Sequence, residues 1–516
     1  QEWQSLADRA RIHGLLMAGR RFFQRGYASI PTAYLTNGPS GVPRWFMGSV
    51  ALGATVAAWL LFSAFVARDV SPSPALDSLE FSAGTLSSSA TTSPTLLDST
   101  LAKVQSATPS IGQARVPSGL QTQSLSDEGL ARVAPLLGQA EARLIDVYRL
   151  ISQGKHREAL VKTDKLVRDH PNFHLAHLVH GDLLSLQMRP VRQLGDVPDT
   201  KAQAAAQQLA VLREESRRRL SALTERPPEG SVPTQFLALS SQSRHAIAVD
   251  ASRSRLYLFE NQTPSASGGR IAPPPRLKLL GDFYISVGLS GIEKVVEGDK
   301  RTPLGVYYIT SNLNPDNLPD LYGVGALPIN YPNPLDMQRG KTGSGMWLHG
   351  TPKEQFVRAP QASDGCVVLS NPDLEKLLST IQIRTTPVVI APELRWVQPD
   401  ALDADRKLFE ASLESWRTAK SDGQVDRLKD FYSSRFQNPG KEPAEWWSRM
   451  ESEVRGAKGP RELQLKDVSM LRWQDSEDTM VVTFGEVAQG QSRGVTRRQY
   501  WARESDQWKI FYEGTP

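Results

Sequence analysis

The chain has 516 residues, 40% of them hydrophobic and 22% charged, and this length and composition predict about three folded domains with packed cores. The formal net charge of +5 arises mostly in residues 1–44, which carry six arginines, no lysine and two acidic residues. This distribution excludes the basic stripe of a nucleic-acid-binding face. The single cysteine, Cys366, excludes an internal disulfide, so each domain must be stable through its own core.

The first predicted element is a membrane-spanning helix over residues 45–67, a run without a charged side chain that is long enough to cross a bilayer. The arginines lie before this run. The positive-inside rule therefore predicts a cytoplasmic tail over residues 1–44 and places the rest of the chain outside. A cleaved signal peptide is the competing interpretation, but the run is long for one and the segment before it is also long. A buried core helix is the remaining alternative.

Residues 68–135 are predicted to form a flexible stalk, because they are rich in Ser, Thr, Pro and Ala and cannot bury enough apolar surface to fold alone. From 136 to 225 the pattern becomes helical. Gly154 separates two amphipathic runs, Ala159 offers a small residue for close helix crossing, and Pro171 ends the second run. This pattern resembles a tetratricopeptide repeat. Only one unit is legible, so a plain helical hairpin or bundle is a nearly equal alternative.

Three histidines of this region, His174, His177 and His180, lie on one flank of a predicted helix, a spacing that could suit a zinc ion. Apolar residues form the opposite face, and no carboxylate lies among the histidines. They are therefore interpreted as the polar side of an amphipathic helix, and no metal site is predicted.

A mostly β domain is predicted over residues 243–396, where short apolar segments alternate with polar turns. The segments HAIAVD and SRLYLFE flank a turn at Ala251-Ser252 and indicate a β-hairpin. One clear helix is expected to start with Asn371 as its N-cap and Pro372 in its first turn.

Cys366 and His349 are the candidate catalytic pair of this domain. A nucleophilic thiol needs a base, a group that orients the base, and hydrogen-bond donors for the oxyanion. His349 follows an apolar strand, while His245 at the first strand is interpreted as structural. Gly365 precedes the cysteine and lets backbone N–H groups approach a substrate. Without the surrounding motifs, Cys366 could equally be an inert buried thiol, and His349 a surface histidine.

The surrounding motifs resemble those of the L,D-transpeptidase (YkuD) catalytic domain. In chain order they are Thr302-Pro303-Leu304-Gly305, His349-Gly350, and Ser363-Asp364-Gly365-Cys366 followed by Val367 and Asn371. The resemblance implies that Cys366 attacks the carbonyl of the third residue of a peptidoglycan stem peptide and that His349 activates it. It also implies that the backbone carbonyl of Gly350 orients the imidazole, and that N–H groups near Gly365 and Cys366 form the oxyanion hole.

One position departs from that family, which usually has Ser-His-Gly-Cys where this chain has Ser363-Asp364-Gly365-Cys366. The base is the upstream histidine, so activity need not be lost. A carboxylate beside the thiol opposes thiolate formation, unless it points away or binds the amine of an incoming substrate. Asp364 is thus expected to alter acceptor or substrate preference more than catalysis.

Residues 400–516 open with a long amphipathic helix and end in several strands, and they resemble the NTF2-like α+β fold, with Trp508-Lys509-Ile510 as the terminal signature. This domain order resembles a subset of the family that trims cell-wall peptides as an L,D-carboxypeptidase. The family assignment favours a transpeptidase, and the two activities differ only in the acceptor. An inactive cell-wall scaffold and a thiol protease on other proteins are the alternatives from other classes.

The predicted span and the family resemblance together lead us to expect a bacterial cytoplasmic-membrane protein with one membrane span and its catalytic part in the periplasm or cell-wall space. The expected partners are peptidoglycan stem peptides and the membrane, with protein partners reached through the helical and NTF2-like regions, and no nucleic acid. No metal or organic cofactor is expected, because a cysteine–histidine pair is sufficient for acyl transfer.

Overall fold

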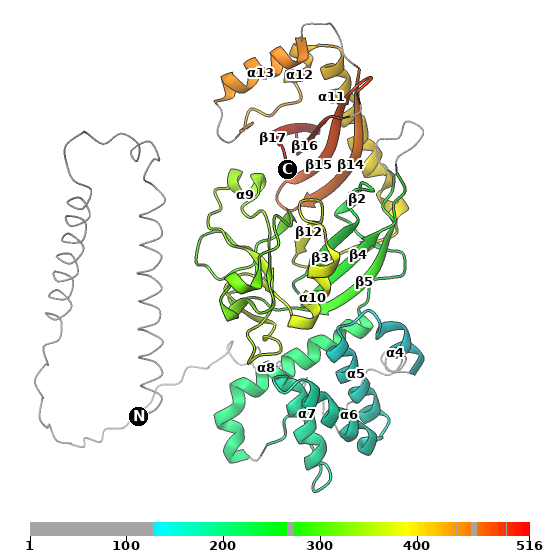
Figure 1. Ribbon diagram of the computed structural model, residues 1–516, viewed down its shortest axis with the longest axis vertical. Coiled ribbons are helices and arrows are strands. Elements are labelled where there is room, and N and C mark those ends of the chain that lie inside the picture. Colours follow the sequence, from blue (N-terminus) through cyan, green and yellow to red (C-terminus); the bar gives the residue numbers. More distant parts are fainter. Residues whose placement is uncertain (1–126, 198, 266–272, 439–441, 456–461, 492) are drawn as a thin grey trace, which may run out of the picture. The chain divides into compact units, whose positions relative to one another are not determined.

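The computed structural model describes residues 127–516 except 198, 266–272, 439–441, 456–461 and 492 (Figure 1). The predicted cytoplasmic tail, the predicted span over 45–67 and most of the predicted stalk therefore lie outside the described residues. Among the helices that the structure does describe, none is both long and apolar enough to cross a membrane.

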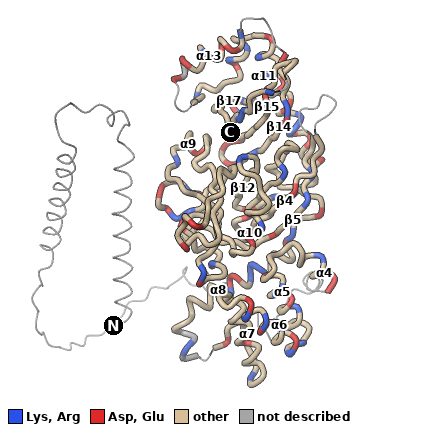
Figure 2. The backbone as a smooth tube through the Cα atoms, viewed as in Figure 1, with Lys and Arg blue, Asp and Glu red and all other residues tan. Residues whose placement is uncertain are grey.

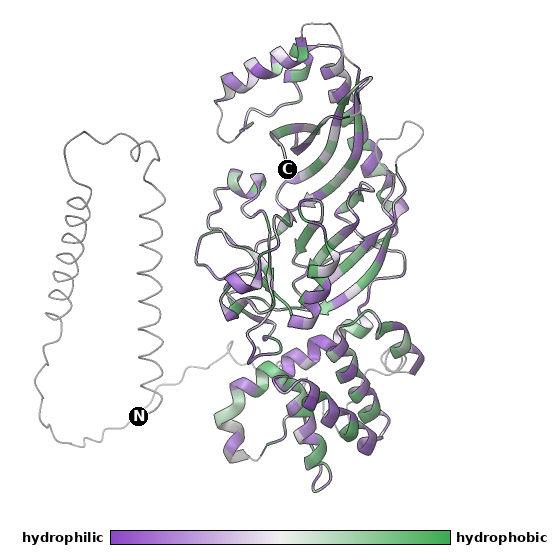
Figure 3. Ribbon diagram, viewed as in Figure 1, coloured by the Kyte–Doolittle hydropathy of each residue, from purple (hydrophilic) through white to green (hydrophobic). Residues whose placement is uncertain are grey.

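Within the described residues, five helices precede the β domain. They are α4 (Asp127–Val133), α5 (Gln139–Ser152), α6 (His156–Asp169), α7 (His174–Ser185) and α8 (Asp199–Thr224). Apolar residues at helical spacing give α5, α6 and α7 a shared core that includes Leu144, Leu166 and Val179. The banding of these helices in Figure 3 reflects this amphipathic pattern. Gly154 has φ +72° between α5 and α6, a conformation that favours glycine.

Helix α4 corrects the predicted extent of the stalk, which was expected to continue to residue 135. Leu130 and Val133 of α4 are buried in a cluster with Ile145 of α5 and Leu223 of α8. A helix of seven residues is not stable alone. Its burial depends on helices that come later in the chain, which is why the local composition did not indicate it.

The β domain is built on a five-stranded sheet in the order β5-β4-β3-β12-β7. Its strands are β3 (His245–Asp250), β4 (Arg255–Asn261), β5 (Leu277–Tyr284), β7 (Gly305–Tyr308) and β12 (Pro387–Ala391). Strands β3 and β4 pair antiparallel from His245↔Glu260 to Asp250↔Arg255, which confirms the predicted hairpin. Strand β12 is parallel to β3 and antiparallel to β7.

Shorter strands of the same domain carry the candidate active site. A three-stranded sheet has the order β11-β9-β8, with β8 (Ala326–Pro328), β9 (Trp347–His349) and β11 (Val367–Val368). Strands β6 (Val287–Gly288) and β10 (Gln361–Ser363) form a parallel pair. The helices are α9 (Pro334–Gln338) and α10 (Asn371–Thr380). Leu374 and Leu377 of α10 are buried in the same core as Leu348 of β9, so the helix is packed against the strand that carries His349.

The C-terminal region combines helices with a meander of long antiparallel strands. The helices are α11 (Asp403–Ser421), α12 (Val425–Lys429) and α13 (Pro443–Arg455), and the strands are β14 (Leu463–Gln474), β15 (Asp478–Ala488), β16 (Val495–Glu504) and β17 (Gln507–Gly514). Helix α11 packs against β14 (Figure 1), with Trp416 fully buried in the core. This arrangement follows the predicted helices and strands and adds α13, which was not expected.

A strand from before the catalytic domain completes this C-terminal sheet. Strand β2 (Phe236–Ala238) pairs antiparallel with β14, which gives the order β17-β16-β15-β14-β2. Nearby, β1 (Val232–Pro233) pairs with β13 (Trp396–Val397). Residues 226–242 lay between the predicted domains. Their pairing partners lie more than one hundred positions away, so no local pattern indicated them.

The β domain and the C-terminal domain share a hydrophobic core. Val389 and Tyr308 of the β domain are buried with Leu471 and Tyr500 of the C-terminal sheet. Arg339, directly after α9, donates to both carboxylate oxygens of Asp475 at 2.6 and 2.8 Å. Basic and acidic residues are interspersed along the described chain (Figure 2).

Candidate active site

The structure brings Cys366 and His349 to adjacent strands. Strands β9 and β11 are parallel, with Leu348 opposite Val367 and His349 opposite Val368. Cys366 comes one residue before β11, at the level of Trp347. Because alternate residues of a strand share a face, Cys366 and His349 lie diagonally on the same face of this strand pair.

The imidazole of His349 is buried, with 3% of the residue exposed, and its orientation is set by its own neighbour. His349 Nδ1 lies 2.7 Å from the carbonyl oxygen of Gly350. A carbonyl oxygen can only accept, so Nδ1 carries the proton and Nε2 holds a lone pair. The ring of Tyr322 meets the imidazole edge to face at 5.0 Å. Burial, together with the charge of Arg358, lowers the pKa of His349 to about 4, so the ring is neutral near pH 7.

A tight turn holds the backbone of Cys366. Ser363 Oγ donates to the carbonyl oxygen of Cys366 at 2.6 Å and accepts from the N–H of Gly365 at 3.1 Å. Thr302 Oγ1 donates to the carbonyl oxygen of Gly365 at 2.8 Å. Gly365 has φ +122°, and a Cβ there would come 2.7 Å from the carbonyl oxygen of Arg301. The motif residues Thr302, Ser363 and Gly365 thus fix the position of the cysteine.

The expected oxyanion donors differ in availability. The N–H of Gly365 points to Ser363 Oγ inside the turn. The N–H of Cys366 has no hydrogen bond among those found in the part of the chain that the structure describes. Of these two N–H groups, we therefore expect that of Cys366 to donate to a substrate oxyanion.

The thiol of Cys366 is partly exposed, and its sulfur lies 3.6 Å from the carbonyl oxygen of Gly345. Burial by the surrounding protein raises its pKa to about 11, while a hydrogen bond from the backbone of Trp347 and the nearby charges of Arg358 and Lys294 lower it. The thiol is therefore protonated near pH 7. Cys366 and His349 rest as a neutral pair, so the thiol proton must be transferred during the attack.

Asp364 is exposed and does not decide the charge of the thiol. Its carboxylate raises the pKa of Cys366, but this effect is smaller than those of burial and of Arg358. The same carboxylate also acts on the guanidinium of Arg358. The side chain found where the family usually has histidine therefore lies outside the cysteine–histidine pair, beside a cation.

Asn371 has a role that sequence reasoning did not find. The N-cap of α10 is Ser370, whose hydroxyl accepts from the N–H of Asp373, which corrects the expected cap at Asn371. Asn371 Oδ1 instead accepts from the N–H groups of Thr351 and Val324, and Nδ2 donates to the carbonyl oxygen of Thr351. It thereby holds the segment directly after Gly350. The only sequence signal was its place in the family motif.

The other histidines considered from the sequence do not form a site. His245 pairs with Gln382 at 3.1 Å, as a structural residue would. His177 Nε2 lies 2.9 Å from the carbonyl oxygen of Pro171, and His180 lies 3.9 Å from Asp164. Within the described ranges, no group of three or more histidine, cysteine or acidic side chains is arranged to hold a metal ion.

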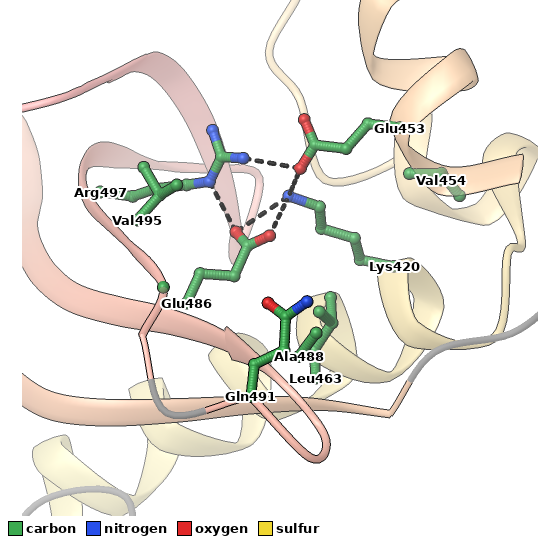
Figure 4. Close-up of a pocket in the computed structure, with 10 residues that line it drawn as sticks. Lys420, Glu453, Val454, Leu463, Glu486, Ala488, Gln491, Val495 and Arg497 are labelled. Atoms are coloured by element: carbon green, nitrogen blue, oxygen red, sulfur yellow. Dashed lines mark hydrogen bonds and ion pairs between the residues drawn. The ribbon is translucent and has the colours of Figure 1, made fainter. Parts of the chain in front are cut away.

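Two cavities lie in or beside the C-terminal domain. The first, of about 260 Å³, is lined by Lys420, Glu453, Glu486 and Arg497 (Figure 4). Its charges are paired, since Lys420 Nζ lies 2.8 Å from Glu486 and Arg497 Nε lies 2.6 Å from the same carboxylate. The second, of about 520 Å³, lies between the β domain and the C-terminal sheet, and its lining includes Lys294.

Comparisons with known proteins agree with both domain predictions. Residues 244–390 match the YkuD family, the L,D-transpeptidase catalytic domain, and residues 408–514 match the Cds6 C-terminal NTF2-like domain. A comparison with curated proteins gave no match.

Several solved structures are similar to part of this chain. Bd1075 of Bdellovibrio bacteriovorus is 25% identical with a TM-score of 0.45, over 55% of this chain and 98% of that one. Pgp2, a helical cell shape determining protein of Campylobacter jejuni, is 22% identical with a TM-score of 0.44, over 55% of this chain and 95% of that one. A point mutant of Pgp2 is 22% identical with a TM-score of 0.42, and the match covers 55% of this chain and 94% of the mutant chain.

Proposed function

Residues 244–390 are an L,D-transpeptidase catalytic domain and residues 408–514 an NTF2-like domain, and from this premise we propose that the chain is a peptidoglycan L,D-transpeptidase. It acts on stem peptides through an acyl-enzyme on Cys366. One observation carries the proposal: Cys366 and His349 share a face of the β9–β11 pair, with the Gly350 carbonyl fixing the imidazole tautomer.

The first half of the reaction forms a thioester. Cys366 Sγ attacks the carbonyl carbon of the third residue of the stem peptide, and the thiol proton passes to His349 Nε2. The N–H of Cys366 stabilises the oxyanion. The C–N bond to the fourth residue then breaks, and His349 returns the proton to the leaving amine.

The second half of the reaction transfers the acyl group to an acceptor. An amine of a second stem peptide attacks the thioester carbonyl and gives its proton to His349 Nε2. The C–S bond breaks, and the proton restores the Cys366 thiol. The neutral resting pair suits both halves, because a neutral imidazole accepts a proton in each attack and donates it in each collapse.

A second candidate is L,D-carboxypeptidase activity, in which water takes the place of the acceptor amine and a tetrapeptide becomes a tripeptide. The observation that favours it is the NTF2-like domain that follows the catalytic domain. The two candidates share every step up to the thioester and use the same residues.

The proposed setting is the outer side of a bacterial cytoplasmic membrane. The uncharged run over residues 45–67 and the arginines before it support an anchor with the catalytic domain in the periplasm or cell-wall space. The helical region and the NTF2-like domain are the proposed contact regions for protein partners.

The test is incubation of the purified full chain with tetrapeptide muropeptides, with the products read by mass and Cys366→Ala as the matched control. A cross-linked dimer or an exchanged fourth residue supports the transpeptidase, and a tripeptide alone supports the carboxypeptidase. Identical products from the wild type and Cys366→Ala overturn both proposals. An inactive cell-wall-binding scaffold would then be the remaining interpretation.

A further inference from the structure

We propose that Arg358 is a specificity-determining residue that binds the free carboxylate of the residue released from the substrate, and that the helical region holds Arg358 in place through Phe356. This inference rests on the proposed function, because it names the group that the site recognises. It extends the site from the cysteine–histidine pair to an element that comes before the catalytic domain in the chain.

Arg358 is partly buried, and its guanidinium reaches the strand β10 that leads into the turn of Cys366. It makes one hydrogen bond among the described residues, a long one of 3.5 Å from Nη1 to the carbonyl oxygen of Ala362. No ion pair to it occurs within the same residues. Arginine stays charged in proteins, and a partly buried cation without a partner is unfavourable. A ligand that supplies a carboxylate would satisfy several N–H donors at once.

The electrostatic neighbours of Arg358 are the residues of the candidate active site. Both Cys366 and Asp364 act on its guanidinium, and Arg358 in turn acts on His349 and Cys366. The guanidinium bonds to Ala362, the residue before Ser363, and Ser363 Oγ holds the carbonyl oxygen of Cys366. The cation is therefore tied to the turn that carries the nucleophile and is within electrostatic range of the thiol. In a stem peptide cut after its third residue, the α-carboxylate of the fourth residue is one carbon away from the scissile nitrogen. We therefore infer that this carboxylate meets Arg358 when Cys366 attacks the carbonyl of the third residue.

The segment that carries Arg358 is anchored in the helical region. Phe356 is 8% exposed and stacks on Phe173 with ring centroids 4.5 Å apart and planes at 30°. It also packs against His170 at 4.9 Å. Phe356 belongs to the core that α5, α6 and α7 share. A side chain from the catalytic domain thus completes the core of another region, two residues before Arg358.

Backbone hydrogen bonds reinforce this anchor. Asn172, between α6 and α7, donates from Nδ2 to the carbonyl oxygen of Lys353 at 2.8 Å and accepts from the N–H of Phe356 at 3.2 Å. Thr351 Oγ1 donates to the carbonyl oxygen of Phe356 at 3.2 Å. The segment from Thr351 to Phe356 is therefore fixed up to two residues before Arg358. Release of Phe356 would free Arg358 without removing it.

The first experiment tests the charge at the thiol without any turnover. Cys366 in the full chain is alkylated with iodoacetate, an anion, and with neutral iodoacetamide, and the ratio of the two rates is compared between variants. We expect Arg358→Gln to lower the iodoacetate-to-iodoacetamide ratio about 10-fold and Arg358→Lys to retain most of it. Asp364→Asn should raise the ratio, because it removes the competing carboxylate. An unchanged ratio in Arg358→Gln overturns the assignment.

The second experiment tests recognition of the substrate. Tetrapeptides with a free or an amidated terminal carboxylate are compared, and the wild type is expected to prefer the free acid by roughly 10- to 100-fold in kcat/KM. Arg358→Gln should lose this preference, mainly because its KM for the free acid rises. Its kcat/KM for the amidated peptide should equal that of the wild type. A preference retained in Arg358→Gln contradicts the proposal. A chain that turns over neither peptide contradicts the proposed function, while the alkylation ratio still decides the role of Arg358.

The third experiment tests the anchor. Phe356→Ala should lower the alkylation ratio towards that of Arg358→Gln. The matched control is Leu150→Ala, which removes a buried side chain from the same core. If Leu150→Ala lowers the ratio as much as Phe356→Ala, or if Phe356→Ala leaves it unchanged, the helical region does not position Arg358.

Discussion

Asn371 Oδ1 occupies the space that a Cβ atom on Gly350 would need. The same oxygen accepts the N–H of Thr351, and the carbonyl of Gly350 accepts the Nδ1 proton of His349. Asn371, at the start of α10, therefore holds the backbone directly after β9. That backbone in turn orients the imidazole of His349.

Gly350→Ala is the substitution that tests this arrangement. The added methyl group would displace Asn371 or the carbonyl that holds His349, and a misplacement of about 1 Å typically costs about 100-fold in rate. We expect kcat/KM for the stem peptide to fall by about that factor. Gly181→Ala is the control, because nothing lies within 4 Å of its added Cβ. It should keep full activity, and comparable losses in both variants would refute the mechanism.

The acid limb of the pH–rate profile should reflect His349. Burial lowers its pKa from 6.5 to about 4, so the neutral base is still present well below the ordinary histidine range. We expect kcat/KM to fall on acidification with an apparent pKa near 4 rather than near 6.5. The measurement is the rate of product formation across this range. A limb centred on 6.5 would mean that the imidazole is not buried in the working enzyme.

The same shift predicts a loss of stability in acid. The folded pKa lies below the unfolded one, so the unfolded chain binds more protons between pH 6.5 and about 4. The stability that the buried neutral His349 contributes is present above pH 6.5 and is lost as the pH falls, by up to about 3 kcal/mol. Urea unfolding of the wild type and of His349→Gln should show a smaller acid dependence in the variant. Parallel curves would contradict this expectation.

Asp373 should have the opposite pH dependence. Its carboxyl packs against the backbone at Gly138, where the helical region meets α10, and burial raises its pKa from 3.8 to about 6. Its contribution is present below pH 3.8 and is lost as the pH rises through 6, when the carboxyl ionises. Asp373→Asn should therefore gain about 2–3 kcal/mol relative to the wild type between about pH 4 and pH 7. A difference that does not change with pH would rule this out.

Ser363→Ala should loosen the turn that holds the nucleophile. It leaves the N–H of Gly365 and the carbonyl oxygen of Cys366 without their hydroxyl partner, and a group left unsatisfied in this way costs about 1–3 kcal/mol. We expect a lower free energy of unfolding together with a lower kcat. Ser379→Ala removes an exposed hydroxyl that donates to Lys376 and serves as the control. It should change neither quantity.

Much of the catalytic and C-terminal domains could be predicted because their patterns are local. The β3–β4 hairpin follows from two alternating segments around a short turn, and α11 follows from its amphipathic spacing. The short strand β2 could not be predicted, because three residues gain their hydrogen bonds only from β14. Helix α4 was assigned to the stalk for the same reason, since Leu130 needs Ile145 and Leu223 to be buried.

The sequence by itself determined the chemistry that the chain has available: one thiol, the histidine that comes before it, and the order of the motifs around them. Only the tertiary structure decided which groups support that chemistry. Phe356 in the core of the helical region and Asn371 behind Gly350 are contacts between residues far apart in the chain. Such contacts depend on how whole elements pack, so no spacing in the sequence encodes them, whereas a motif carries its chemistry in the identity of neighbouring residues.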